Sequence, residues 1–239
     1  MRIILVGLYL FIFGIFSIIA LPLLWMTGKF NSGLQRRISQ RIVKLAFGKV
    51  LFLSGIKKKV IGVERVPKDN PVLFIINHRG FFDVILAFYT VPVLSGFVSK
   101  KEIAKVPGLR IWMKFINCVF LDRENPREGI KAILKGIENI KSGISMFISP
   151  EGTRNSGEGL LEFKPGSLKM AEKTGCPIVP VAITNADKVF EDHLPWIQPY
   201  EMTIEYGEPI LIHELSKEAK AELLEHCREK VLELYEKNL

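Results

Sequence analysis

The hydrophobic pattern of this chain begins with one long apolar stretch and continues as short apolar runs between polar segments. No charged residue occurs among the 24 residues from Ile3 to Met26, which Arg2 and Lys29 flank. As a helix this stretch would be about 36 Å long, enough to cross a hydrocarbon core of about 30 Å. It is longer than the apolar region of a signal peptide, and a domain-like pattern follows it. We therefore predict a retained membrane anchor, which either crosses the bilayer or lies within one leaflet.

The following stretch, Leu34 to Ile56, has the pattern of a basic amphipathic helix. Its apolar positions can share one face while its basic residues gather elsewhere, with Leu34, Ile38, Ile42, Leu45 and Phe52 set against Arg36, Arg37, Arg41 and Lys44. Lys57 to Lys59 come next, and each such charge near anionic lipid is worth about 1 kcal/mol. If the first segment spans, these charges place the rest of the chain on the cytoplasmic side. The alternative is that this helix packs on the domain that follows, with its charges in water.

From about Val60 onward, apolar runs of strand length alternate with helical stretches. The runs are Val60 to Val63, Val72 to Ile76, Phe97 to Ser99, Cys118 to Leu121, Ile144 to Ile148, Ile178 to Ile183 and Met202 to Tyr206. Helices are predicted at Asp83 to Phe88, Arg127 to Lys141, Gly166 to Lys173, and from a Ser216 cap through Tyr235. This alternation predicts an α/β fold with a largely parallel central sheet flanked by helices. We therefore expect an N-terminal membrane-anchoring helical segment, residues 1–57, and an α/β domain, residues 58–239.

The strand at Val72 to Ile76 stops at Asn77-His78, and a helical pattern begins near Asp83. His78 is therefore expected on a strand-to-helix turn, where Gly80 supplies backbone freedom. On a continuous helix His78 and Asp83 would point about 140° apart, whereas a turn can bring the carboxylate onto the imidazole. Such a pair can act as base and orienter, because the carboxylate fixes the tautomer whose other nitrogen accepts a proton. The alternative is that Asp83 simply caps the helix and His78 is structural.

Three further clusters lie at or within predicted strands, near the edge where ligands gather in parallel sheets. They are Asp122-Arg123, then Ser149-Pro150-Glu151-Gly152-Thr153-Arg154, and Val179-Pro180-Val181. Two arginines at parallel strand ends suggest a phosphate site, since the guanidinium is planar, permanently charged and bidentate. Alternatively, Arg123 pairs with a neighbouring acid and Arg154 with Glu151, as weak surface ion pairs. Pro180 removes a ladder donor, which indicates an edge strand or an irregular, functionally shaped stretch.

Composition narrows the classes of function. The net charge of +8 fits anionic lipid and an anionic substrate, because no nucleic-acid-binding module is visible. Cys118, Cys176 and Cys227 are too scattered for a disulfide framework or a zinc site and fit a reducing compartment. No metal cluster is evident, no G-x-S-x-G elbow of a lipase occurs, and no further long apolar span supports a transporter.

Taken in order, these motifs resemble those of the glycerolipid acyltransferase family, specifically the 1-acyl-glycerol-3-phosphate acyltransferases. His78 and Asp83 match its H-x4-D motif, Phe120-Leu121-Asp122-Arg123 its second block, Pro150-Glu151-Gly152-Thr153-Arg154 its third and Val179-Pro180-Val181 its fourth. The resemblance covers roughly residues 60–190. Two positions depart from the usual pattern: Asn117 stands where the second block commonly has glycine, and Ser149 where the third commonly has phenylalanine. Neither departure removes a charged group, so we expect them to affect the fine shape of the site and not its activity.

The resemblance implies an O-acyltransferase that needs no cofactor. It would move a fatty acyl group from an acyl thioester, of acyl carrier protein or coenzyme A, to the 2-hydroxyl of 1-acyl-sn-glycerol 3-phosphate. His78 and Asp83 would be catalytic. The glycerol phosphate would be bound by Arg123, Glu151, Gly152, Thr153 and Arg154, with Lys100 as a further basic position, while Pro180 would help shape the acyl site.

The expected setting is the cell membrane, with the catalytic domain on the cytoplasmic face and with membrane lipid and lysophosphatidic acid as partners. Donors for the developing oxyanion are expected among backbone N–H groups near the turn or the third block. One alternative is a related acyltransferase that acts on glycerol 3-phosphate or another lysophospholipid, and a second is a non-catalytic lipid-binding membrane protein. Acyl length, carrier identity and oligomeric state do not follow from these patterns.

Overall fold

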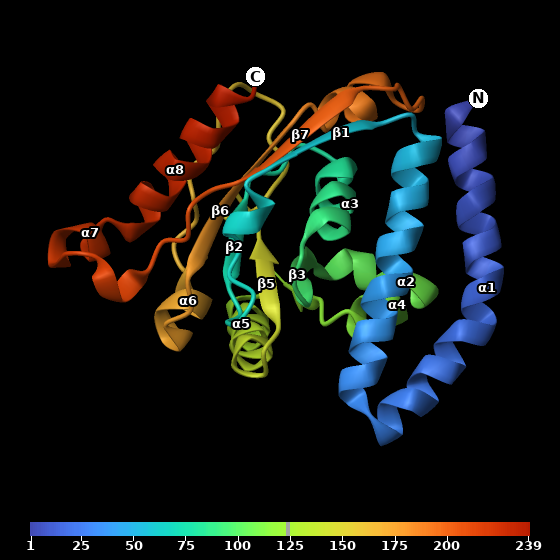
Figure 1. The fold of residues 1–239 in the computed structure, drawn as a ribbon, viewed down its shortest axis with the longest axis horizontal. Helices are drawn as coiled ribbons and strands as arrows, with labels where there is room; N and C mark the ends of the chain where they lie inside the picture. Colours follow the sequence, from blue (N-terminus) through green and yellow to red (C-terminus); the bar gives the residue numbers. More distant parts are fainter. Residues whose placement is uncertain (123–124) are drawn as a thin grey trace.

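The computed structural model describes residues 1–122 and 125–239. The described residues form a seven-stranded sheet with the strand order β1-β7-β6-β2-β5-β3-β4 (Figure 1). The strands are β1 (Lys57–Ile61), β2 (Leu73–Ile76), β3 (Ser95–Lys100), β4 (Val119–Leu121), β5 (Ser145–Ile148), β6 (Ile178–Thr184) and β7 (Glu201–Tyr206). β6 and β7 pair antiparallel, and the other neighbouring strands pair parallel. The predicted α/β fold with a largely parallel sheet is confirmed.

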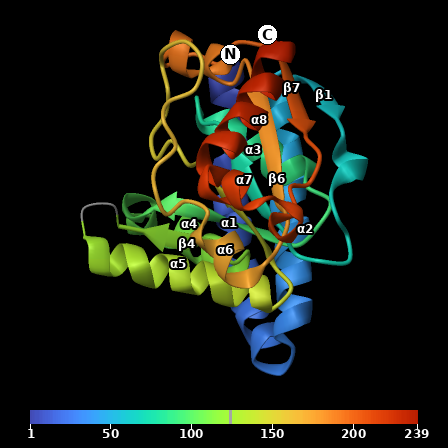
Figure 2. The same cartoon turned by 90° about the vertical axis from the view of Figure 1, so that its left-hand side faces the viewer.

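Helices cover both faces of this sheet. They are α1 (Arg2–Phe30), α2 (Ser32–Leu53), α3 (Phe81–Thr90), α4 (Pro107–Phe115), α5 (Pro126–Lys141), α6 (Lys169–Thr174), α7 (Lys217–Ala221) and α8 (Leu223–Lys237). Successive strand residues point to opposite faces, so Phe74 and Ile76 of β2 share a core with α2, α3 and α4. Leu73 and Ile75 share the opposite core with α5, α6 and α8. α8 lies over β6, and α5 lies beside β4 (Figure 2).

The first two helices form a hairpin that packs along the α/β domain (Figure 1). Leu51 of α2 is fully buried in the core that also contains β2. α1 is held at two places: Arg2 Nε donates to Ser54 O at 3.2 Å, and Trp112 Nε1 of α4 donates to Ser17 Oγ at 2.9 Å. The N-terminal helices therefore share a hydrophobic core with the domain, as the alternative interpretation of the second helix expected.

The outward side of α1 is apolar and exposed. By length and composition, α1 is the one helix within the described ranges that could cross a membrane. Its large exposed side chains include Ile4, Leu8, Phe11, Ile12, Ile15, Phe16, Ile18, Ile19, Leu23 and Trp25. Such a surface suggests membrane association.

Two segments differ from the prediction. The strand predicted at Val60 to Val63 is β1, which begins earlier, at Lys57, so that the three lysines after the second helix are its first residues. β1 is an edge strand, where lysines discourage the addition of a foreign strand. The single final helix expected from Ser216 to Tyr235 is divided at Glu222 into α7 and α8, although Ser216 Oγ does cap α7 by accepting the N–H of Ala219 at 3.1 Å.

Pro180 lies inside the sheet and not on an edge, because β6 pairs with β2 on one side and β7 on the other. The stretch is irregular, however. Val181 faces Tyr206, but Ile178 bridges to Ile210, so the register shifts by one residue between these pairs. Pro180, which has no N–H to donate, lies at this break. Its carbonyl oxygen still accepts the N–H of Gly207 at 2.8 Å.

Leu51 and Phe52 allow a test of the shared core, since these neighbours on α2 are 0% and 72% exposed. Leu51→Ala should lower the free energy of unfolding by about 2–5 kcal/mol, because it leaves a cavity. Phe52→Ala should change it by less than about 0.5 kcal/mol. Chemical denaturation of the full chain in detergent micelles measures both, and equal effects would mean that α2 does not share the core of the domain.

Candidate active site

The chain that leaves β2 is anchored before it turns. Asn77 is buried, and its side chain pairs with the backbone of Ile183 in β6. Nδ2 donates to Ile183 O at 2.9 Å, and Oδ1 accepts the Ile183 N–H at 2.8 Å. His78 follows with 24% of its side chain exposed. The imidazole is therefore accessible although the backbone before it is fixed.

His78 and Asp83 are in contact across the turn, as predicted. His78 Nδ1 lies 3.0 Å from Asp83 Oδ2, and the same oxygen accepts the N–H groups of Arg79 at 2.6 Å and Gly80 at 2.7 Å. Because an ionised carboxylate can only accept, Nδ1 donates and Nε2 is left to accept a proton. Asp83 thus both caps α3 and orients His78, so the two interpretations of this residue hold together.

Glu191, in a short 3-10 helix (Glu191–His193), closes over the first turn of α3. Its Oε1 accepts the N–H of Phe81 at 2.8 Å and lies 3.7 Å from Arg154 Nη1. A Cβ on Gly80 would lie 2.4 Å from Glu191 Oε2. Gly80 has an extended φ of −159°, so glycine serves close approach here and not the backbone freedom that the sequence suggested. Burial raises the pKa of Glu191, against the opposing effects of the Phe81 N–H and Arg154.

Arg154 lies beside the turn that carries His78. Its guanidinium carbon is 3.9 Å from the centroid of the Phe81 ring, at the start of α3. Its acidic neighbour is Glu191, whereas the sequence had suggested Glu151. The guanidinium remains exposed in part, and its stacked, planar fork is suited to binding an anion.

Glu151 holds the same turn from behind. Its carboxylate is buried, with Oε1 accepting the N–H of His78 and Oε2 that of Leu161, each at 2.9 Å. Asn155 N–H in turn donates to His78 O at 2.8 Å. Burial raises the pKa of Glu151, and the N–H groups of Leu161 and His78 oppose this shift. Both carboxylate oxygens are therefore used to position the backbone around His78.

Gly152 closes the turn that presents Glu151. Its N–H donates to Ser149 O at 3.1 Å, and its φ of +73° is a conformation that glycine adopts without strain. A Cβ there would also meet the Lys164 side chain at 2.8 Å. Thr153 follows as an exposed residue. The predicted third block thus lies directly behind the predicted catalytic pair.

Arg79 and Asp187 belong to this site, as does Glu191, although the sequence pattern did not identify them. Arg79 Nε donates to Asp187 Oδ2 at 2.7 Å, and Nη2 donates to Gly157 O at 2.7 Å. Its guanidinium also lies 5.5 Å from the centroid of Tyr235 in α8. Arg79 therefore ties the catalytic turn to three distant segments. The one signal in the sequence that could have identified Arg79 is its position next to His78.

The remaining basic candidates lie further along the sheet edge. Lys100 ends β3 opposite Leu121 of β4, and its ammonium lies 3.7 Å from Glu102. Arg123, predicted to bind phosphate, lies outside the described residues. The end of β4 is three strands from the end of β2, which corresponds to about 14 Å at the usual strand spacing.

Pro180 lies on the face of the sheet that α8 covers. It shares this face with Ile178 and Ala182, and both Pro180 and Leu234 of α8 lie beside Gly207. Its predicted role in shaping the acyl site stays a prediction. Within the described ranges, no group of three or more His, Cys, Asp or Glu side chains could hold a metal ion.

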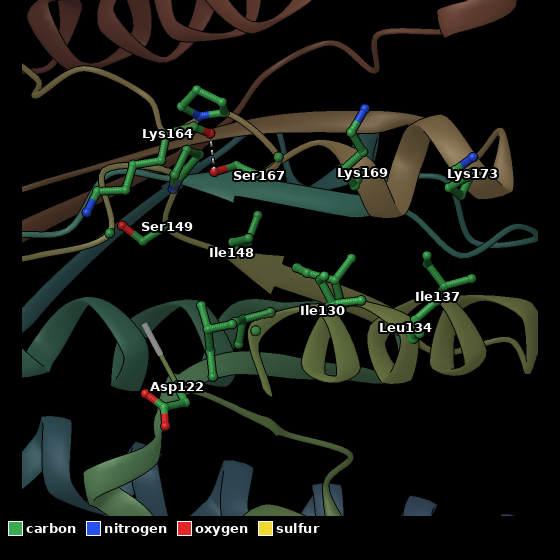
Figure 3. Close-up of a pocket in the computed structure, with 18 of the residues that line it drawn as sticks. Asp122, Ile130, Leu134, Ile137, Ile148, Ser149, Lys164, Ser167, Lys169 and Lys173 are labelled. Carbon is green, nitrogen blue, oxygen red and sulfur yellow. Dashed lines mark hydrogen bonds between the residues drawn. The ribbon is translucent and has the colours of Figure 1, made fainter. Parts of the chain in front are cut away.

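A groove of about 840 Å³ runs between α5 and the segment that leads into α6, and the last residues of β4 and β5 are part of its lining (Figure 3). Ile130, Leu134 and Ile137 line it along α5, and Ile148 faces them. At one end it reaches the two neighbours of Glu151 in the third block, and its lysines are Lys141, Lys164, Lys169 and Lys173. The arrangement is an apolar groove with a basic rim that begins next to the turn that carries His78.

The chain is similar to known proteins over most of its length. The family model for acyltransferases matches residues 57–184. The 1-acyl-sn-glycerol-3-phosphate acyltransferase of Borreliella burgdorferi is 31% identical over 186 residues, covering 78% of this chain and 74% of that protein. The protein of the same name from Saccharomyces cerevisiae is 30% identical over 224 residues, covering 92% of this chain and 72% of that protein.

A solved structure is similar as well. The crystal structure of the 1-acyl-sn-glycerophosphate (LPA) acyltransferase PlsC from Thermotoga maritima matches with a TM-score of 0.82 and 26% sequence identity. The match covers 99% of this chain and 97% of that chain. It therefore extends beyond the α/β domain into the N-terminal helices.

Glu151→Gln tests the positioning role of this residue. The substitution replaces one acceptor oxygen by an NH2 group, which leaves the N–H of His78 or Leu161 without an acceptor. A buried donor left unpaired costs about 1–3 kcal/mol, so amide exchange around His78 should accelerate by about tenfold to hundredfold. Hydrogen-exchange mass spectrometry of the full chain measures this. Glu158→Gln, an exposed position in the same loop, should leave exchange unchanged, and an equal effect of both variants would contradict the role.

Proposed function

This chain belongs to the acyltransferase family, and we propose that it acylates the 2-hydroxyl of 1-acyl-sn-glycerol 3-phosphate to give phosphatidic acid. The acyl donor is a thioester of acyl carrier protein or coenzyme A. The observation that carries the proposal is the 3.0 Å contact between His78 Nδ1 and Asp83 Oδ2 on the turn after β2. The relatives named for this reaction support the choice of acceptor.

In the proposed reaction, His78 Nε2 takes the proton of the 2-hydroxyl while the oxygen attacks the thioester carbonyl. The carbon–sulfur bond of the tetrahedral intermediate then breaks, and the departing thiolate takes the proton from the imidazolium. The nearby negative charge of Asp83 favours the imidazolium between these steps. Glu151 keeps the His78 backbone in place throughout.

The phosphate of the acceptor binds, in this proposal, at the arginine of the third block. Arg154 lies on the ring of Phe81, three residues from His78, and its guanidinium is accessible. Lys100, opposite Leu121 at the end of β4, extends the positive edge toward the second block, whose Arg123 is proposed as a further phosphate ligand. Gly152 and Thr153 shape the loop that leads to Arg154, which is where the glycerol would lie.

We further propose that the groove along α5 takes an acyl chain. Its isoleucine and leucine lining offers burial worth about 0.8 kcal/mol for each methylene, and its end lies at the third block. The exposed side of α1 holds the domain on the cytoplasmic face of the membrane, so that the lipid acceptor need not enter bulk water. Because Ser17 of α1 is hydrogen-bonded to Trp112 of the domain, we propose that α1 lies within one leaflet.

His78→Ala should abolish most acyl transfer from a labelled acyl thioester to lysophosphatidic acid. The expected loss is roughly a hundredfold to ten-thousandfold, the usual contribution of a general base. His213→Ala, at a histidine whose side chain is 73% exposed, is the matched control and should keep full activity.

Glycerol 3-phosphate is assayed in parallel as acceptor. If glycerol 3-phosphate is the preferred acceptor, the role of His78 as the general base still holds, but the proposed acceptor is wrong. If purified protein in lipid shows no turnover with either acceptor, the chain is the non-catalytic lipid-binding protein considered above. Full activity of His78→Ala would contradict the mechanism.

Leu134→Trp should shorten the acyl chain that the groove accepts. Leu134 is half-exposed on α5 and lines the groove, so the indole fills space without disturbing the core. Each methylene that loses its place should lower kcat/KM by about fourfold, while short acyl chains should react normally. The control is Lys135→Trp, at the neighbouring position that does not line the groove. A series of acyl lengths measures both, and an unchanged length preference would exclude the groove as the chain site.

A further inference from the structure

The N-terminal half of α4 projects from the domain with apolar side chains in water. Every residue from Lys105 to Ile111 is exposed. Val106, Leu109 and Ile111 are 54%, 45% and 39% exposed, and burial begins at Trp112. We name Lys105 to Lys114 the α4 tip. A helix end with exposed apolar side chains on it is characteristic of an interaction surface.

Positive charge surrounds these apolar residues. A hollow of about 710 Å³ in the α4 tip is lined by Lys105, Arg110 and Lys114 together with Ala104, Pro107 and Ile111. Among the described residues, this lining contains three cations and no carboxylate. The mixture of exposed aliphatic side chains and unopposed cations suits a partner that is apolar inside and anionic outside.

The base of the α4 tip packs against the domain-facing side of α1. Trp112, at its base, donates from Nε1 to Ser17 Oγ of α1 at 2.9 Å, and its ring centroid lies 5.4 Å from that of Phe13. Figure 1 shows α4 beside α2 and α1, at the end of the sheet away from α7. The α4 tip therefore emerges beside the helix whose outward side is apolar and exposed.

We propose that the α4 tip is a second membrane-contacting element that binds anionic lipid head groups. Val106, Leu109 and Ile111 enter the interface, and Lys105, Arg110 and Lys114 pair with lipid phosphates. The position of the α4 tip beside α1 favours a membrane over an acidic protein as the partner. A single helix in the interface would leave the domain free to rotate about the axis of α1. The second contact fixes that rotation and with it the direction in which the active-site edge faces the bilayer.

The test compares Arg110→Gln/Lys114→Gln with Lys217→Gln/Lys220→Gln in the full chain. Both pairs remove two positive charges from exposed helix positions, and α7 lies on the opposite side of the sheet from α1 (Figure 1). Each protein is equilibrated between phosphatidylcholine vesicles and vesicles that also contain phosphatidylglycerol, which are separated by density. Because α1 contributes to binding on both kinds of vesicle, the ratio of protein bound to the two kinds measures the contribution of the positive charges alone.

The α4 variant should lose anionic preference by about fivefold for each charge, or about thirtyfold in all at low salt. The loss should shrink at high salt, where such contacts are screened, and the α7 control should partition as the native chain does. Leu109→Ser should weaken binding to both vesicle types by a similar factor. An unchanged ratio in the α4 variant, or an equal loss in the control, would overturn the proposal. An unchanged ratio with a raised KM for acyl carrier protein would assign the surface to an acidic protein instead.

Discussion

One carboxylate oxygen, Asp83 Oδ2, receives three N–H groups, two from the backbone of the turn and one from His78. A buried carboxylate is tolerated only when donors replace its water, and here the donors come from the segment that must be shaped. A second buried carboxylate, Glu151, accepts the N–H of His78 from the other side. The geometry of the His78 turn is thus set mainly by contacts with its backbone, and these contacts are buried or partly buried.

The sheet topology assembles the motifs in an order that differs from the chain. β5 lies between β2 and β3, so the third block is the immediate neighbour of the His78 turn, while the second block lies three strands away. Because parallel strands deliver their carboxyl ends to one edge, the His78 turn, the third block and the described part of the second block reach the same side of the molecule, whereas the fourth block lies within β6. The groove along α5 lies between the third block and the described part of the second block, and residues of both blocks line it.

Features with local patterns could be predicted from the sequence. The H-x4-D turn, the third block and the spacing of α5 each depend on residues that are close in the chain. Arg79 with Asp187 and Gly80 with Glu191 could not be predicted, because these partners lie more than 100 residues apart and meet only in the folded sheet. α4 was missed because its nine residues are too few for the helical period to stand out, and Pro107 and Gly108 at its start are typical of a turn. The start of β1 was predicted three residues too late because an exposed edge strand carries no alternation of buried residues.

The place of β1 also sets an order of events during synthesis. Its one partner in the sheet is β7, and the paired residues Lys57 and Glu201 are 144 positions apart. The apolar α1 and the strand that follows α2 therefore leave the ribosome long before the segment that completes their side of the sheet. In that interval the lysines of β1 keep an unpaired edge from joining other chains. α1 can meanwhile settle on a bilayer, so that the last strands fold onto a chain already at its surface.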